Sequence, residues 1–151
     1  MKIKIVRKII FFSAFICTLP CLSFAQCKSF VKKHCEYKIA PFISNGQMNT
    51  TTMTSGQIAD MPMTFYAGQS YRIVVCAQEV LGTIQFKLLD KAQHVIFDST
   101  QNNDPDFWDF NVNTTQEFTI EVTVPPSDAA DGLMQSGCVS ILVGFKAQGK
   151  P

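Results

Sequence analysis

The chain has 151 residues and a formal net charge of +1, and 46% of its residues are hydrophobic while 17% are charged. This composition is typical of a globular protein and argues against intrinsic disorder. Four of the 13 basic residues lie in the first eight positions, which leaves nine against 12 acidic residues in the rest of the chain. Without a basic patch there, we expect no nucleic acid partner.

The first 25 residues have the three regions of a secretory signal peptide. Basic residues at positions 2–8 precede an apolar segment at 9–22, and Ser23-Phe24-Ala25 places small residues at a cleavage site. A membrane anchor is the alternative, but the apolar segment is short of the ~20 residues that a span needs. A lipid anchor at Cys21 is a second alternative. We predict cleavage after Ala25 and export to the periplasm, the outer membrane or the medium, with no membrane span in the mature protein.

The mature chain, residues 26–151, has the length of a single domain. Its first segment, residues 28–42, is predicted to be a short helix, because apolar residues recur there at helical spacing. These residues are Phe30, Val31, Cys35, Ile39 and Phe42.

The remainder reads as strands and turns. Seven strands are expected, at about 57–66, 70–78, 82–90, 94–100, 107–113, 116–124 and 137–146, and an eighth at 48–54. In the clearest strand, 116–124, apolar residues alternate with polar ones before Pro125-Pro126 ends it. Such alternation is typical of antiparallel sheets with one buried face. The sequence therefore predicts an all-β, antiparallel β-sandwich, jelly-roll-like, with a short N-terminal helix.

Four cysteines remain after cleavage, which indicates two disulfides in an exported protein. A zinc site is the alternative, but it would need a close pair such as C-x-x-C. Cys76 and Cys138 lie in strands, both off the main apolar face, so we predict a Cys76–Cys138 bond. Cys27–Cys35 follows by elimination. Because eight helical residues rise ~12 Å and disulfide Cα atoms lie within ~7 Å, this second bond requires the chain to fold back before the helix.

An acidic cluster surrounds Pro105. Ca²⁺ takes six to eight oxygen ligands, often from Asp and Asn at alternating positions of a loop. The candidate ligands are Asp98, Asn102, Asp104, Asp106 and Asp109. A solvated turn is the alternative, because Asn, Asp and Pro favour turns. Apart from this Ca²⁺ candidate, no cofactor is expected.

Aromatic and methionine residues suggest two further sites. Trp108 and Phe110 have the parity of the core face, whereas Phe107 has the outward parity and is a candidate for stacking on a sugar ring. A methionine cluster can bind Cu(I), although core or loop filling is the favoured interpretation. The methionines concerned are Met48, Met53, Met61 and Met63.

The sequence offers little support for catalysis. His34 and His94 are the two histidines of the chain, and no G-x-S-x-G motif is present. We interpret both histidines as surface or turn residues. A small hydrolase remains an alternative.

The order of several motifs resembles small β-sandwich modules of exported proteins. These motifs are Phe65-Tyr66-Ala67-Gly68-Gln69-Ser70-Tyr71-Arg72-Ile73, Leu88-Leu89-Asp90 and Trp108-Asp109-Phe110. They resemble modules of the pre-peptidase C-terminal and Golgi-dynamics types over about residues 56–145, and the whole chain resembles small secreted proteins of Bacteroidota-type bacteria. The resemblance implies a β-sandwich with a non-catalytic role and carries no active-site residue.

We therefore expect an exported, non-catalytic binding or structural module of the cell envelope, with an unknown protein or glycan as its partner. The alternatives are a Ca²⁺- or carbohydrate-binding module and a small hydrolase. Exposed sheet edges and residues 98–109 are the places where a partner would bind.

Overall fold

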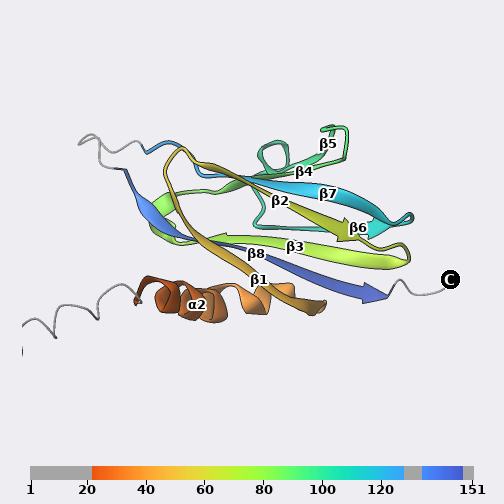
Figure 1. Cartoon of the computed structure of the whole chain (residues 1–151), viewed down its shortest axis with the longest axis horizontal. Coiled ribbons are helices and arrows are strands. Elements are labelled where there is room, and N and C mark those ends of the chain that lie inside the picture. The colour runs from red at the N-terminus through yellow and green to blue at the C-terminus, as the bar shows by residue number, and fades with distance from the viewer. Residues whose placement is uncertain (1–21, 128–133, 148–151) are drawn as a thin grey trace, which may run out of the picture.

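The computed structural model describes residues 22–127 and 134–147, so the predicted signal residues 1–21 lie outside the described residues. Within these described residues, eight strands form two four-stranded sheets that face each other as two layers (Figure 1). One sheet contains, in spatial order, β1 (Ile43–Thr54), β8 (Ser136–Ala147), β3 (Gln69–Ala77) and β6 (Phe107–Val112). The other contains β2 (Ile58–Phe65), β7 (Gln116–Thr123), β4 (Gln85–Leu89) and β5 (Val95–Asp98).

Every strand pair is antiparallel, and the two spatial orders, 1-8-3-6 and 2-7-4-5, are those of a jelly roll. The prediction of an all-β, antiparallel sandwich is therefore confirmed. The segment proposed as an eighth strand, 48–54, is part of β1, which begins five residues earlier. Two short 3-10 helices, η2 (Glu79–Leu81) and η3 (Ser99–Gln101), connect strands.

The core lies between the two sheets and is built from the inward positions that alternation predicted. Ile73 in β3, Leu88 in β4 and Ile120 in β7 are completely buried. At about 25 cal/mol per Å² of apolar surface, each such side chain contributes about 1.5–3 kcal/mol through its burial. Hydrophobic burial therefore holds the two layers together.

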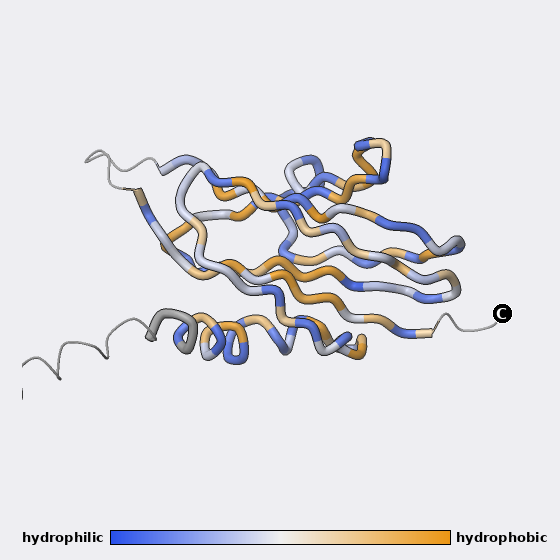
Figure 2. Tube along the Cα trace, viewed as in Figure 1, coloured by the Kyte–Doolittle hydropathy of each residue, from blue (hydrophilic) through white to orange (hydrophobic). Residues whose placement is uncertain are grey.

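A helix covers the outer face of the sheet that contains β3 and β8 (Figure 1). The helix α2 (Leu22–His34) is followed by the 3-10 helix η1 (Glu36–Ile39). Val31 of α2 and Ile39 of η1 pack against Val74 of β3 and Leu142 of β8 in a second buried cluster. For this reason β3 and β8 are apolar on both faces, and their traces are orange over their central parts in Figure 2.

The helix differs from its predicted bounds of 28–42. The α-helix ends at His34, and Glu36–Ile39 continues as a 3-10 helix. Pro41 explains why no helix continues past Ile39, because Ala40 before it is extended, with a ψ of 140°, and a residue before proline is disfavoured in the helical region. At the other end α2 begins at Leu22, so the predicted cleavage site after Ala25 lies inside it. Cleavage there would leave Gln26–His34 as helix.

The predicted disulfide pairing is wrong. The bonds join Cys27 to Cys138 and Cys35 to Cys76, with Cα atoms 5.4 and 5.9 Å apart, respectively. Cys76 and Cys138 do share the outer face of neighbouring strands, as expected, but α2 and η1 cover that face. Since Cys27 and Cys35 lie about 12 Å apart along the helical direction, each reaches a different strand cysteine instead of the other. The two bonds attach the helical segment covalently to β8 and β3 of the sheet.

Close packing of η1 on β8 requires a glycine. A Cβ atom at Gly144 would lie 2.8 Å from Cγ2 of Ile39 and 2.8 Å from Cβ of Phe42. Both distances are shorter than van der Waals contact, so any side chain at position 144 would push η1 away from the sheet.

Candidate functional site

Within residues 22–127 and 134–147, β1 is a free edge strand, and it lacks the usual protection against pairing with another chain. It is 12 residues long, and the sequence Ile43–Thr54 contains neither a charged residue nor a proline. Most of its side chains are exposed. Figure 2 shows the contrast in polarity, because much of the β1 trace is pale or blue beside its apolar neighbours. Natural proteins usually protect such edges with charges, prolines or short strands.

The other three edges carry that protection. β2 contains Asp60 and Pro62 in its middle. β5 has only four residues, and β6 has six with Asp109 among them. A bulge between Ser44 and Met48 is the one protective feature of β1, and it lies toward the start of the strand. The straight segment 48–54 is therefore the edge best suited to pair with another strand.

Main-chain groups of Met48, Thr50 and Thr52 point toward this free edge. The N–H of Gln78 donates to the main-chain oxygen of Cys138 at 3.0 Å, so the main-chain groups of Cys138 face β3. Cys138 lies opposite Thr52 in the β1–β8 register. Because main-chain groups alternate in direction along an antiparallel strand, those of positions 48, 50 and 52 point away from β8. The N–H of Thr54 follows the same alternation and bonds the side-chain Oε1 of Gln57.

A groove opens between β1 and β2 on the inner face of β1, and we call it the side groove. Its volume is about 260 Å³. Asn49 and Thr51 of β1 form its rim, and Asp60 of β2, whose side chain has the outward parity of Ile58, borders it. Its apolar lining comes from Met53, Ala59, Met61, Val122, Val139 and Ile141.

A second groove of about 510 Å³ lies between the same two strands near the bulge. Asn45 and Gln47 line one wall, and Met63 and the exposed Tyr66 line the other. On the outer face of β1, a further groove of about 320 Å³ separates Met48 and Thr50 from Lys28 of α2. The segment 45–52 is thus bordered by grooves on both faces.

Aromatic side chains pack between the two sheets on the opposite side of the sandwich. Phe97 of β5 stacks on Trp108 of β6 with ring centres 4.4 Å apart, and Trp108 stacks on Phe110 at 4.7 Å. Both Trp108 and Phe110 pack against the main core, as their parity predicted. The β5–β6 side is filled by large rings, whereas the inward positions 49 and 51 of β1 hold asparagine and threonine.

The acidic residues proposed as calcium ligands have separate partners. Asp98 accepts hydrogen bonds from the N–H and the hydroxyl of Thr100, and its main-chain oxygen accepts one from Asn102. Asp106 forms an ion pair with Lys38. Asp104 lies in a turn, with a positive φ of 47°. Among the described residues, no group of three His, Cys, Asp or Glu side chains converges as a metal site would require.

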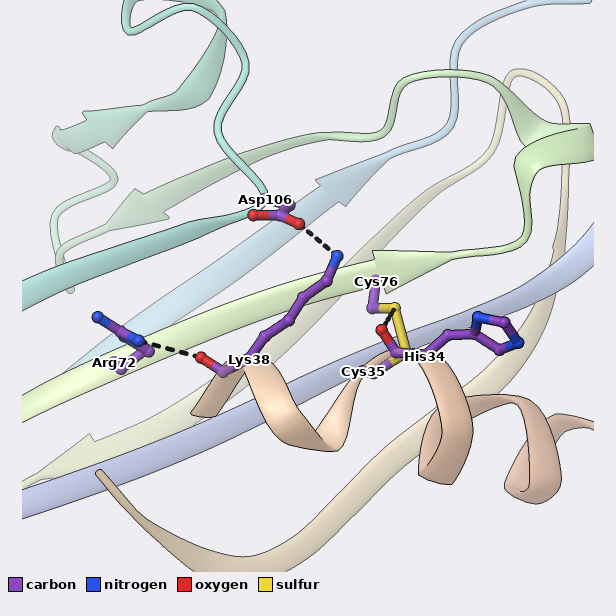
Figure 3. A network of polar contacts seen from close by, with 6 residues as sticks. All are labelled: His34, Cys35, Lys38, Arg72, Cys76 and Asp106. Atoms are coloured by element: carbon purple, nitrogen blue, oxygen red, sulfur yellow. Dashed lines mark hydrogen bonds and ion pairs between the residues drawn. A yellow bond between two sulfur atoms is a disulfide. The ribbon is translucent and has the colours of Figure 1, made fainter. Parts of the chain in front are cut away.

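Asp109 belongs to a network around Arg72 that links η1 to the sheet, and Figure 3 shows the part of this network that joins Arg72 to the main-chain oxygen of Lys38. Arg72 donates to both carboxylate oxygens of Asp109, each at 2.7 Å, and to the main-chain oxygens of Lys38 and Ala40 at 3.0 and 2.6 Å. Hydrogen bonding to Asp109 raises the pKa of Arg72, whereas partial burial lowers it to a smaller extent. Together with the Lys38–Asp106 pair and the Cys35–Cys76 bond, this network fixes the helical segment.

Phe107, the proposed sugar-stacking residue, is 41% exposed, as its outward parity predicted. However, the guanidinium carbon of Arg72 lies 4.4 Å from the centre of its ring. The Arg72 cation therefore occupies a position against the ring that a sugar would otherwise take.

The methionines and histidines proposed from the sequence fall into different environments. Met53 and Met61 line the side groove, but Met48 lies on the other face of β1. His34 is exposed at the end of α2 and stacks on Phe30. His94 is exposed and contacts the carboxylate of Asp90 at 3.1 Å.

Reasoning from the sequence missed the β1 edge as a specific site. One signal was available, namely the absence of charge and proline over the 12 residues 43–54. Its meaning depends on strand order, which places β1 at the border of a sheet next to β2.

No helix within the described residues has both the length and the apolar character needed to cross a membrane. Comparison with protein-family models gives no match, and comparison with curated proteins gives none. Among solved structures, the chain is similar to a periplasmic inhibitor of g-type lysozyme, PliG, from Aeromonas hydrophila. The two chains are 15% identical with a TM-score of 0.49, and the match covers 70% of this chain and 89% of the inhibitor.

Proposed function

We propose that this protein is an exported, non-catalytic binding module of the cell envelope that binds an extended segment of a partner protein along the free edge of β1. The observation that carries the proposal is the unprotected edge at 48–54, bordered by grooves on both faces. Export is supported by the predicted signal peptide and by the two disulfides, which persist in oxidising compartments.

Strand addition would use the main chain of β1 for affinity and its grooves for specificity. The outward main-chain groups of Met48, Thr50 and Thr52 recur at every second residue, which is the spacing that a partner strand needs. Side chains of the partner strand would point alternately toward the inner and the outer face of the sheet. The side groove and the groove beside α2 lie on those two faces.

Replacing Thr50 by proline tests the proposal, because proline removes an outward N–H without removing one from the β1–β8 ladder. The Thr50 hydroxyl also contacts Oγ of Ser140 at 2.9 Å, so Thr50→Val controls for loss of the hydroxyl alone. Thr64→Pro is the matched control on β2. It lies two residues after Pro62 and shares that residue's edge orientation.

The probe is a fluorescent peptide selected from a random library of peptides about as long as β1. We expect Thr50→Pro to weaken binding on the order of tenfold, and Thr50→Val and Thr64→Pro to stay within about twofold of the wild type. Circular dichroism would verify that each variant is folded. Failure to select any peptide, or unchanged binding by Thr50→Pro, would overturn the proposal.

A carbohydrate ligand is the second candidate, and the groove near the bulge favours it. Tyr66 is 59% exposed and lines this groove together with Asn45 and Gln47. Aromatic rings and amides are the groups that contact sugar faces and hydroxyls. A glycan array compared between the wild type and Tyr66→Ala tests this candidate, and the absence of any bound glycan would remove it.

A further inference from the structure

The side groove is apolar at its base but is bordered by a polar strand. Met53, Val139 and Ile141 are buried below it, while Asn49 and Thr51 at its rim are exposed. Asn49 and Thr51 share the inward parity of Met53, so they point toward the second sheet. Neither of them covers the apolar base. An inward-facing apolar surface therefore remains accessible from the β1 edge.

The groove has the size of a site for one or two side chains. Its volume of about 260 Å³ lies below the range of about 300–1,000 Å³ that is common for pockets of drug-sized ligands. A strand paired with β1 would place its inward side chains about 4.5–5.5 Å from the Cβ atoms of Asn49 and Thr51. Those side chains would lie over the mouth of the groove.

Resting on the strand addition proposed above, we propose that the side groove binds an uncharged, apolar anchor side chain of the partner strand. A charged side chain would lose its hydration against Met61 and Val139 without gaining a partner at the base. The partner is thus an extended polypeptide with an aliphatic residue at the inward position opposite Asn49 or Thr51.

A second copy of this chain fits the groove poorly. Pairing of β1 with a second β1 would bring the polar inward residues of segment 48–52, Asn49 and Thr51, over the apolar base. A partner of different sequence, with an apolar residue there, buries more apolar surface.

Filling the groove from β2 provides the first test. Ala59→Phe adds bulk inside the groove and leaves the β1 main chain unchanged, because Ala59 is an inward residue of β2. Ile58→Phe is the matched control, since Ile58 is 62% exposed on the opposite face of the same strand. The probe is the selected peptide, together with versions in which each apolar residue is changed to Ala or Asp.

We expect one peptide position at which Ala weakens binding on the order of tenfold and Asp weakens it further. Ala59→Phe should weaken the parent peptide to a similar extent and should abolish the effect of the Ala change, whereas Ile58→Phe should stay within about twofold. If Ala59→Phe binds the peptide normally while Thr50→Pro does not, the proposal of an anchor side chain in the side groove is wrong, whereas strand addition to β1 is still supported. If both variants bind normally, strand addition itself is wrong.

Methyl NMR of the wild-type protein provides a second test that does not depend on the folding of a variant. Addition of the peptide should shift the methyl signals of Met53 and Met61, which line the groove, more than that of Met134, which is 70% exposed elsewhere. If the peptide binds and the Met53 and Met61 signals do not change, the proposal of an anchor side chain in the side groove is wrong. A dimer in sedimentation that Ala59→Phe dissociates would also overturn it, in favour of a second copy.

Discussion

Arg72 of β3 donates two parallel hydrogen bonds to Asp109 of β6, from Nε to Oδ1 and from Nη2 to Oδ2, each 2.7 Å long. The two residues are direct partners in the strand register. The remaining Nη1 atom bonds the main-chain oxygens of Lys38 and Ala40, so a single guanidinium links two strands and the helical segment. Bidentate pairs of this kind are stronger than ordinary surface ion pairs.

Arg72→Gln should therefore destabilise the protein. Glutamine has two donors where the guanidinium has five, so two carbonyl oxygens and a carboxylate would lose partners. We expect the free energy of unfolding to fall by about 2 kcal/mol, measured by urea denaturation.

Lys87→Gln is the matched control, because Lys87 pairs across strands with Glu121 at a longer distance of 3.8 Å. An exposed pair of this kind contributes little, and its loss should change stability by less than about 0.5–1 kcal/mol. Equal effects of the two variants would show that the network around Arg72 has no special role.

The number of free thiols in two double variants should distinguish the observed disulfide pairing from the pairing predicted from the sequence. Replacing Cys35 and Cys76 by alanine should leave no free thiol, because Cys27 and Cys138 stay bonded. Replacing Cys76 and Cys138 should leave Cys27 and Cys35 as two free thiols. The first variant should lose about 2–5 kcal/mol of stability. Thiol titration of the unfolded proteins gives the count, and two free thiols in the first variant would contradict the pairing.

Asp90 should contribute to stability in a pH-dependent way. Hydrogen bonds from the main-chain N–H groups of His94 and Ala92 lower the pKa of Asp90, and its contact with the His94 ring adds to this. A carboxylate with a lowered folded-state pKa stabilises the protein above its unfolded pKa of about 3.9, and this contribution is lost as pH falls through the folded value.

The melting temperature of the wild type should accordingly exceed that of Asp90→Asn at about pH 6, and the difference should disappear toward about pH 2.5. Thermal melts across this range measure it. A difference that persists at the acid end would mean that asparagine is harmful for a reason other than charge.

Calcium should leave the melting temperature unchanged. Asp106 and Asp109 form ion pairs with Lys38 and Arg72, and Asp98 accepts hydrogen bonds from Thr100. A metal ion would have to break these contacts before it gained its six to eight oxygens. Melting curves with added Ca²⁺ or with EDTA test this, and a stabilisation that depends on Asp104 or Asp106 would establish a calcium site.

Strand positions were predictable because a strand with one buried face alternates apolar and polar residues along its sequence. In β7, Phe118, Ile120 and Val122 are buried, as the period of two required. The outer face of β3 and β8 was harder to interpret. Val74 and Leu142 are apolar at outward positions, which indicated a covering element, and α2 with η1 is that element. Taken together with the helical rise of ~12 Å, this cover would have favoured bonds from the helical segment to the two strand cysteines over a Cys27–Cys35 bond.

The β1 site could not be located in the same way. Whether a polar strand is a free edge depends on which strands flank it, and the jelly-roll order pairs β1 with β8 across about 90 residues of sequence. The sequence of β1 itself does not indicate that β8 is its neighbour. Similarly, Asp106 and Asp109 pair with Lys38 and Arg72, which are distant in the sequence. The acidic cluster alone therefore gave no indication of these ion pairs.

The nested connectivity of the disulfides has a consequence for biogenesis. A chain that enters an oxidising compartment from its N-terminus presents Cys27 and Cys35 first, yet neither is the native partner of the other. The native bonds join the first cysteine to the fourth and the second to the third. Any bond that forms early between Cys27 and Cys35 must be exchanged, because thiolate attack is the route from one disulfide to another. Correct maturation of this protein therefore depends on a disulfide isomerase, or on delayed oxidation until β8 has arrived.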